Sequence, residues 1–196
     1  TKKDVKSFML ESTPAVPAGG AEQPLTPMRQ AIAEHMVRST HTSAHVTTVF
    51  EVDMSTVVAH HQEHQAQFDH DGIKLTFTAY FIAASAAALQ AHPIVNSTLI
   101  EDRIVLKDQI NIGVAVSLGE EGLIVPVIKN AAGKPLGETA GELNELVARA
   151  RARQLQPDEV QDGTFTITNH GVSGSLLATA IINQPQCAIM GVGAVQ

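Results

Sequence analysis

The chain has 196 residues, of which 44% are hydrophobic and 17% charged, and its formal net charge at pH 7 is −7. Apolar residues are too abundant for a mainly disordered chain, and no apolar run reaches the roughly 18 residues that a membrane-spanning helix needs. The acidic balance, the absence of tryptophan and the 4% aromatic content argue against nucleic-acid binding, which uses basic surfaces and aromatic stacking platforms. A single cysteine excludes an internal disulfide and predicts a reducing compartment.

Composition divides the chain into three parts. Residues 1–11 form a short amphipathic piece, and residues 12–24 are rich in Pro, Ala and Gly, which is typical of a linker. Residues 25–196 then carry the periodic apolar patterns of one globular domain.

Within that domain, apolar spacing and breakers predict the elements in order. We expect helices over residues 27–39, 55–68, 76–91 and 135–154, and strands over residues 46–54, 96–100, 103–106, 110–117, 123–128, 164–168 and 188–192. In the first helix, Ile32 and Met36 are spaced to face a core, and the segment GEEG at 119–122 is expected to turn a hairpin. Helices alternating with strands, some joined by hairpins, predict an α/β sandwich with a mixed sheet.

Several patterns with chemical meaning have ordinary explanations as well. His60 to His64 spell H-x-x-E-H, a metalloprotease pattern, but five-residue motifs arise easily in a chain with nine histidines, so we expect no metal site. Arg149, Arg151 and Arg153 form a local basic cluster that could hold an anionic ligand. Cys187 stands next to apolar residues, so a buried structural cysteine is favoured over a nucleophile.

The most informative stretch is GTFTITNHG at residues 163–171. In a strand, Thr164, Thr166 and Thr168 share one face. Three hydroxyls on one face are compatible with a solvated sheet surface. Alternatively, a hydroxyl placed where a strand enters a glycine loop is suited to stabilising a developing oxyanion.

The same region carries a family resemblance. FTITNHGVSGSLLATAIINQPQCAIMGVGAVQ, together with PLTPMRQAIAEHMVRS, TTVFEVDM, GIKLTF, HPIVNSTL, NIGVAVS and GLIVPVIKN in that order along the chain, resembles the catalytic domain of dihydrolipoyl acyltransferases, the core subunits of 2-oxo acid dehydrogenase complexes. The opening TKKDVKSF resembles the end of a peripheral subunit-binding domain.

The resemblance implies a fold and a setting. The fold would be like that of chloramphenicol acetyltransferase, a two-layer α/β sandwich with a mixed sheet that forms homotrimers with active sites between subunits and assembles into a larger cage. The partners would be the dehydrogenase and dihydrolipoamide dehydrogenase subunits and a lipoyl domain, with neither nucleic acid nor membrane. The setting would be the bacterial cytoplasm or the mitochondrial matrix.

The resemblance also implies a reaction, the transfer of an acyl group between a dihydrolipoyl thiol and coenzyme A. Thr168 matches the hydroxyl residue that stabilises the oxyanion, and a threonine there, followed by GVSGSL, is closer to the succinyl-transferring branch. Coenzyme A contacts carry over to Thr76, Ser117 and Asn169. Many relatives have an arginine where this chain has His61, which lacks the charged fork that pairs with phosphate.

The family signature D-H-R-x-x-D-G, which supplies the base histidine, does not occur within residues 1–196, and we expect it to follow in a longer polypeptide. His170 is a weaker candidate for the base, because a turn is expected after Asn169. Two other hypotheses remain: an inert fragment that contributes only assembly contacts, and a free-standing acetyltransferase. The linker and the preceding domain remnant argue against the second.

Overall fold

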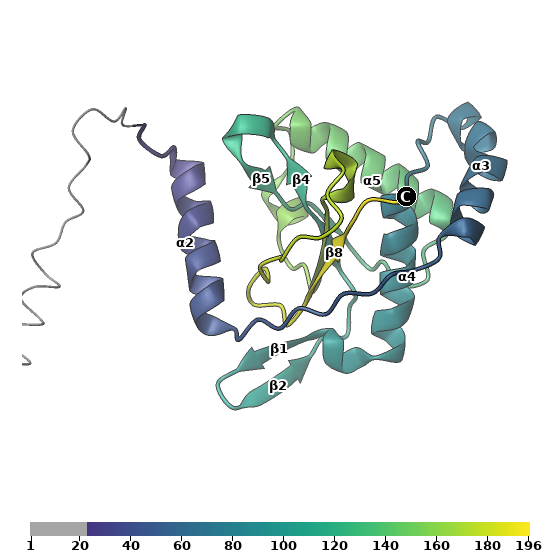
Figure 1. Ribbon diagram of the computed structural model, residues 1–196. Coiled ribbons are helices and arrows are strands. Elements are labelled where there is room, and N and C mark those ends of the chain that lie inside the picture. The colour runs from purple at the N-terminus through teal and green to yellow at the C-terminus, as the bar shows by residue number, and fades with distance from the viewer. Residues whose placement is uncertain (1–22) are drawn as a thin grey trace, which may run out of the picture.

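The computed structural model describes residues 23–196. The predicted domain remnant at 1–11 and all but the last two residues of the 12–24 linker lie outside the described residues. At the centre is a four-stranded sheet whose strands follow the order β6 (Val127–Ile128), β3 (Ile112–Val114), β7 (Phe165–Asn169) and β8 (Ile189–Val192) (Figure 1). β3 and β7 are parallel, as are β7 and β8, whereas β3 and β6 are antiparallel. The predicted mixed sheet is therefore confirmed.

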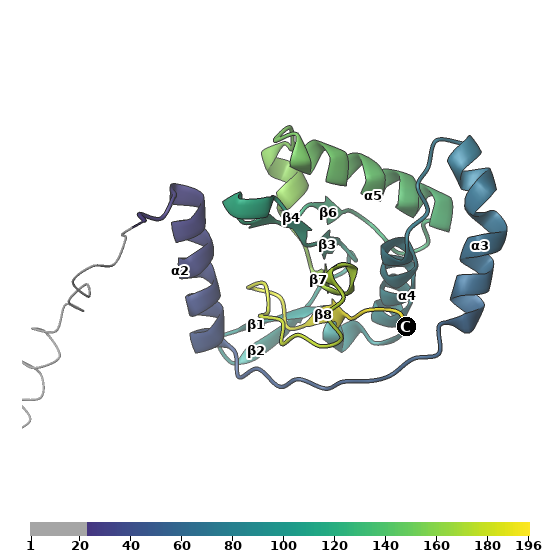
Figure 2. The ribbon, with the colours of Figure 1, turned by 45° about the horizontal axis from the view of Figure 1, so that its top comes forward.

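Helices cover one face of this sheet. α4 (Phe77–Ala91) and α5 (Leu136–Arg151) pack against it, and α3 (Ser55–His70) lies outside α4 (Figure 2). The core between these layers is built from buried side chains of α4, α5 and the strands, among them Ile82, Leu143, Ile112, Ile128 and Ile167. The helix positions agree with the apolar periodicity, because α5 buries Ala140, Leu143, Leu146 and Ala150 on one side.

Two small hairpins flank the central sheet. β1 (Ser97–Ile100) pairs with β2 (Arg103–Leu106), and β4 (Val116–Ser117) pairs with β5 (Leu123–Ile124) through the 3₁₀ turn Gly119–Glu121. The predicted hairpin at GEEG is thus confirmed. The two long strands expected at 110–117 and 123–128 are each split in two. The break on the second falls at Val125 and Pro126, where proline cannot donate to a ladder.

Helix α2 (Pro27–Thr42) stands apart from the core. Its start follows the expected capping, since Thr26 accepts a hydrogen bond from the Arg29 backbone at 3.3 Å. Its end is held by polar contacts to a distant loop, including Ser39 Oγ to the Ile182 carbonyl at 2.5 Å. Ser39 is its buried residue, and the expectation that Ile32 and Met36 enter the core is wrong, because both are only half-buried and neither belongs to the core cluster.

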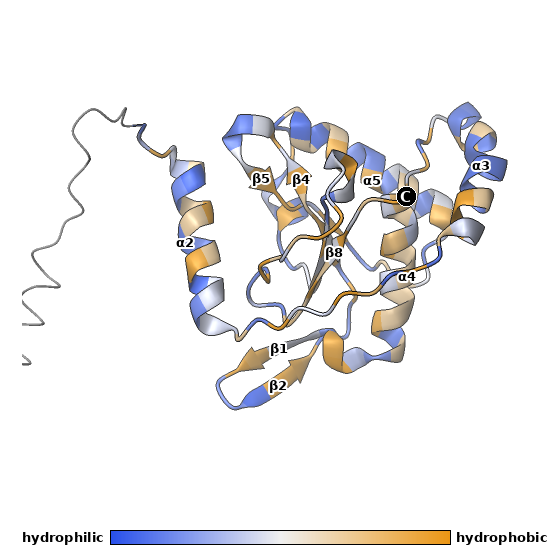
Figure 3. Cartoon of the chain, in the orientation of Figure 1, coloured by the Kyte–Doolittle hydropathy of each residue, from blue (hydrophilic) through white to orange (hydrophobic). Residues whose placement is uncertain are grey.

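The segment Val46–Met54 was expected to be a strand, and this expectation is corrected. It is extended but pairs with no strand among residues 23–196, and it runs across the outside of the domain from α2 to α3 (Figure 2). Phe50 is 82% exposed and Val46 87% exposed. Figure 3 shows that the β1–β2 hairpin close to this segment is also strongly apolar, with Leu99, Ile104 and Leu106 exposed.

Among residues 23–196, no helix has the length and apolar character needed to cross a membrane.

Candidate active site

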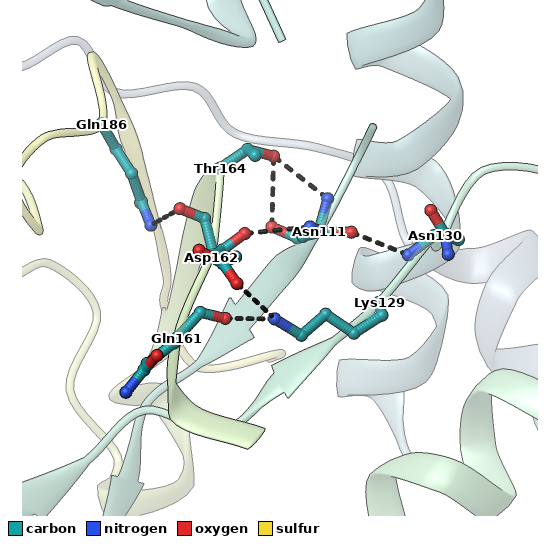
Figure 4. A network of polar contacts seen from close by, with 8 residues as sticks. Asn111, Lys129, Asn130, Gln161, Asp162, Thr164 and Gln186 are labelled. Carbon is teal, nitrogen blue, oxygen red and sulfur yellow. Dashed lines mark hydrogen bonds and ion pairs between the residues drawn. The ribbon is translucent and has the colours of Figure 1, made fainter. Parts of the chain in front are cut away.

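The start of β7 is fastened by a polar network around Asn111 (Figure 4). The Thr164 hydroxyl accepts from the Asn111 backbone N–H at 3.0 Å and donates to the Asn111 carbonyl at 3.2 Å. The Asn111 side chain donates to the Asp162 carbonyl at 2.9 Å and accepts from the Asn130 N–H at 2.9 Å. Asn111 therefore joins three segments that meet at the entry of the strand.

Thr166, the next residue on the same face, is also fully engaged. Its hydroxyl donates to Gln186 Oε1 at 2.7 Å, and the Gln186 amide donates to the Gly163 carbonyl at 2.9 Å. Thr166 is 1% exposed and Thr164 8% exposed. A solvated sheet surface is therefore the wrong interpretation for these two hydroxyls, because both are buried and each is bonded within the fold, one to Asn111 and the other to Gln186.

Thr168 differs from both. It is half-buried, its hydroxyl makes no hydrogen bond within the described part of the chain, and its oxygen is not sealed from solvent. Among the three threonine hydroxyls on this face, residues 23–196 bond those of Thr164 and Thr166 and leave that of Thr168 available to a ligand.

The opposite face of the strand end is occupied by Asn169. Its amide nitrogen donates to Thr78 Oγ1 on α4 at 3.1 Å, and its oxygen accepts from the Gly171 N–H at 3.1 Å. The side chain therefore ties the end of β7 to the first turn of α4 and to the turn that follows. The strand ends at Asn169, one residue beyond the predicted end at Thr168, and the expected turn follows as a 3₁₀ turn that begins at Gly171.

Two more of the predicted residues lie at the same end of α4. Thr76 precedes its first turn, and its buried hydroxyl has no partner within residues 23–196. His61 Nε2 donates to the Leu75 carbonyl at 3.0 Å, and its ring lies 4.9 Å from that of Phe77. Thr76, His61 and Asn169 thus gather around the N-terminal turn of α4.

Ser117 is not part of this group. It lies on β4 at the far end of α5, where its hydroxyl accepts from the Gly119 N–H at 3.2 Å. It lines an open cavity of about 350 Å³ together with Arg151, Arg153 and Glu121.

The predicted basic cluster is largely neutralised by carboxylates of the chain itself. Arg149 forms a two-pronged ion pair with Glu159 and also contacts Glu145, and Arg153 pairs with Glu121. The hydrogen bonds from Arg149 hold the pKa of the Glu159 carboxyl below its ordinary value, and Glu159 in turn raises the pKa of Arg149. Arg151 alone among the three has no ion pair within residues 23–196.

The other sequence patterns fall outside the site. The His60 and His64 rings stack at 4.1 Å, with their Nδ1 atoms bonded to the Tyr80 hydroxyl and the His60 carbonyl. Within residues 23–196, no three or more His, Cys, Asp or Glu side chains are placed to hold a metal ion. Cys187 is exposed rather than buried, with Sγ 3.0 Å from the Val95 carbonyl.

Sequence reasoning missed a close backbone contact beside Thr168. A Cβ on Gly171 would lie 2.2 Å from the Gly193 carbonyl oxygen, and one on Gly193 would lie 2.3 Å from the Leu176 carbonyl oxygen. The glycines of the GVSGS and GVG segments therefore let three backbones touch at the end of β7 and β8. The spacing of these glycines was visible in the sequence, but their contact was not.

Comparison with known proteins defines the class. A model of the 2-oxoacid dehydrogenases acyltransferase (catalytic domain) family matches residues 17–196. Among solved structures, a probable dihydrolipoamide acetyltransferase from Listeria monocytogenes superposes with a TM-score of 0.87 at 38% identity, covering 91% of this chain and 76% of that chain. The Azotobacter vinelandii dihydrolipoamide acetyltransferase does so with a TM-score of 0.89 at 33% identity, covering 93% and 77%.

Curated relatives agree. The lipoamide acyltransferase component of the Bacillus subtilis branched-chain alpha-keto acid dehydrogenase complex is 42% identical over 92% of this chain and 43% of its own length. The succinyltransferase component of the Azotobacter vinelandii 2-oxoglutarate dehydrogenase complex is 40% identical over 88% of this chain and 44% of its own length. The chain spans less than half the length of these relatives. It belongs to the 2-oxoacid dehydrogenase acyltransferase family and corresponds to the catalytic domain.

Proposed function

We propose that this domain transfers an acyl group between a dihydrolipoyl thiol and coenzyme A, with Thr168 as the donor to the oxyanion. The observation that carries the proposal is the contrast between the three threonines at β7. Thr164 and Thr166 are bonded within the fold, whereas the hydroxyl of the half-buried Thr168 has no partner within residues 23–196 and keeps access to solvent. A hydroxyl held on a rigid strand costs little reorganisation when charge develops on a carbonyl oxygen.

In the proposed reaction, the thiol loses its proton to a base and attacks the thioester carbonyl. Thr168 donates to the oxygen of the tetrahedral intermediate, which then collapses with release of the other thiolate. We assign the role of this base to the histidine of the D-H-R-x-x-D-G signature that the family resemblance implies, a signature that does not occur within residues 1–196. A relative supports this assignment, because a serine, a histidine and an asparagine have been investigated for roles in the catalytic mechanism of the Azotobacter vinelandii enzyme.

Coenzyme A would lie near the N-terminal turn of α4. The buried hydroxyl of Thr76, which has no partner within residues 23–196, and the nearby His61 and Asn169 support this placement. His61 Nε2 and the Asn169 amide are already hydrogen-bonded within the fold. Their role would therefore be to position the N-terminal turn of α4 rather than to bind the phosphates of coenzyme A directly. Ser117 lies apart from these three residues within one protomer. A contact between Ser117 and the same coenzyme A molecule would therefore require a second copy of the chain.

For the acyl group we propose succinyl. The support is the threonine at position 168 followed by GVSGSL, which resembles the succinyl-transferring branch. Overall identity does not discriminate, because acetyl-, branched-chain- and succinyl-transferring relatives are 39%, 42% and 40% identical.

The domain would act as a homotrimer within the core of a 2-oxo acid dehydrogenase complex, served by a lipoyl domain and by dehydrogenase and dihydrolipoamide dehydrogenase subunits. The exposed apolar side chains of Val46, Val49, Phe50 and Val52 support contact with further copies, because a contiguous exposed apolar surface marks an interaction site. A solved relative with a TM-score of 0.89 forms the cubic core of a pyruvate dehydrogenase multienzyme complex.

The test replaces Thr168 by serine and by valine in the complete polypeptide that contains this chain. Turnover is measured with dihydrolipoamide and acetyl-, isobutyryl- and succinyl-coenzyme A. Because removing one oxyanion donor costs about 100-fold to 1,000-fold in kcat, the valine variant is expected to lose activity on that scale and the serine variant to keep most of it.

Equal activity of wild type and Thr168→Val would overturn the role of Thr168. Turnover that is fastest with acetyl- or isobutyryl-coenzyme A would replace succinyl as the acyl group. Absence of turnover with all three donors would support the assembly-only hypothesis, and transfer to a small-molecule acceptor in place of dihydrolipoamide would support the free-standing acetyltransferase.

A further inference from the structure

His170 directly follows β7, and its ring lies on the same face as Thr168. Thr168 and Gly191 are register partners in parallel strands, so their Cβ positions project from one face of the sheet. A Cβ on Gly191 would lie 3.4 Å from His170 Nε2 and 3.8 Å from its Cδ2. The imidazole therefore lies on the Thr168 face of the sheet, at van der Waals distance from where a Cβ at position 191 would stand.

The backbone holds His170 in this place. Its N–H donates to the Val192 carbonyl at 3.1 Å, and its carbonyl accepts from the Ser173 N–H at 3.2 Å and the Ser173 hydroxyl at 2.7 Å. Three hydrogen bonds to β8 and to the following turn thus fix the residue.

The surroundings of the two ring nitrogens differ. Nδ1 is buried and has no partner within the described part of the chain, whereas Nε2 is unbonded there but not buried. Buried N–H groups without a partner are rarer than under-satisfied acceptors, so hydrogen-bond satisfaction places the ring proton on Nε2. Two hydrogen-bond donors without partners among residues 23–196, the Thr168 hydroxyl and the His170 Nε2–H, then stand side by side on one face.

We propose that His170 Nε2–H is a second donor to the oxyanion, acting together with Thr168; this rests on the proposed acyl transfer. When the thiolate sulfur forms its bond to the carbonyl carbon, the π electrons of the C=O bond move to the oxygen, and both donors bond to it. When the C=O bond reforms, the bond from carbon to the leaving sulfur breaks and the leaving thiolate carries the electron pair. His170 neither takes nor gives up a proton.

The experiment compares His170→Leu, which has similar size and no donor, with His170→Gln, which keeps an N–H near the Nε2 position. kcat and KM are measured in the complete polypeptide with acetyl-, isobutyryl- and succinyl-coenzyme A, and the pH profile of kcat is recorded. The leucine variant is expected to lower kcat about 10-fold to 100-fold for all three donors with KM little changed, and the glutamine variant to recover most of the loss.

Other results would overturn the inference in distinguishable ways. A loss confined to succinyl-coenzyme A would mean that His170 recognises the acyl carboxylate. An equal loss of kcat in both variants would mean that His170 acts through packing. A pH profile of kcat that loses an ionisation in His170→Gln would mean that His170 acts as a base. Unchanged kcat in His170→Leu, alongside the expected loss in Thr168→Val, would remove this inference and leave the proposed function standing. Absence of turnover by the wild type would remove both.

Discussion

The backbones of Gly171 and Gly193 meet where the parallel strands β7 and β8 end, so closely that a Cβ on Gly171 would lie 2.2 Å from the Gly193 carbonyl oxygen and 2.6 Å from the Ala194 nitrogen. The contact brings the turn after β7 onto the chain after β8. It sets the position of the residues beside Thr168, including His170, through backbone atoms that cannot move aside as a flexible side chain can.

Replacing Gly171 by alanine is therefore expected to destabilise the fold by about 1–3 kcal/mol or more, because the added methyl group overlaps with backbone. Gly141→Ala in α5 is the matched control. Its Cβ would lie 3.8 Å from Ile73, an ordinary contact, and alanine in a helix is expected to stabilise by about 0.5–1 kcal/mol. Urea unfolding of the two variants measures both effects, and equal stability of Gly171→Ala and wild type would contradict the contact.

Substitutions of Thr166 and Thr168 are expected to have different effects, the first on folding stability and the second on acyl-transfer activity. Thr166→Val removes the donor to Gln186 Oε1, an acceptor on a buried side chain, and is expected to cost about 1–3 kcal/mol. Thr168→Val removes no hydrogen bond within residues 23–196, so its unfolding midpoint should stay close to that of the wild type while turnover falls. Thermal unfolding and the acyl-transfer assay on both variants test the pair. A Thr168→Val variant that unfolds as early as Thr166→Val would show that its hydroxyl is structural.

The Arg149–Glu159 ion pair is expected to make the folding stability depend on pH in the acidic range. The pKa of Glu159 is lower in the folded chain than its unfolded value of about 4.3, chiefly through the hydrogen bonds from Arg149. Ionised Glu159 therefore stabilises the fold fully above the unfolded pKa, and this contribution is lost as pH falls through the folded pKa. Glu159→Gln is expected to lower Tm at neutral pH, with the difference shrinking in acid below about pH 4.

Glu145→Gln is the control for that series. Glu145 also contacts Arg149, but its side chain is 70% exposed, and exposed single ion pairs contribute little. Melting curves of the two variants over a series of pH values should show a pH-dependent difference from wild type in Glu159→Gln and almost none in Glu145→Gln. A constant difference at every pH would mean that Glu159 acts through packing.

The exposed segment Val46–Met54 is expected to hold copies of the chain together. Phe50→Glu places a charge where an 82% exposed aromatic ring stands, and it should shift the assembly toward smaller species. Thr47→Glu adds the same charge on the other face of the extended segment and is expected to change the assembly less. Sedimentation velocity measures both. Unchanged assembly in Phe50→Glu would show that this segment does not hold the copies together.

Local patterns predicted the elements well where a single segment carries its own signal. α4 and α5 follow from apolar periodicity and breakers, and β7 follows from its alternation. The expectations were wrong where contacts with a distant segment of the chain determine the pairing or burial of a residue. Val46–Met54 has the composition of a strand but lacks a neighbour within the described chain, and Cys187 is exposed although apolar residues follow it. The arginine cluster was visible, but the carboxylates that pair with Arg149 and Arg153 come from other segments.

The sequence by itself determined that three threonines alternate along one strand and that a glycine-rich turn follows them, because side-chain direction in a strand depends on local backbone geometry alone. Only the tertiary structure decided which hydroxyl is free. Thr164 and Thr166 are bonded by Asn111 and Gln186, which lie 53 and 20 residues away along the chain, and no partner reaches Thr168 within residues 23–196. Long-range packing brings such partners together, and no local pattern records it.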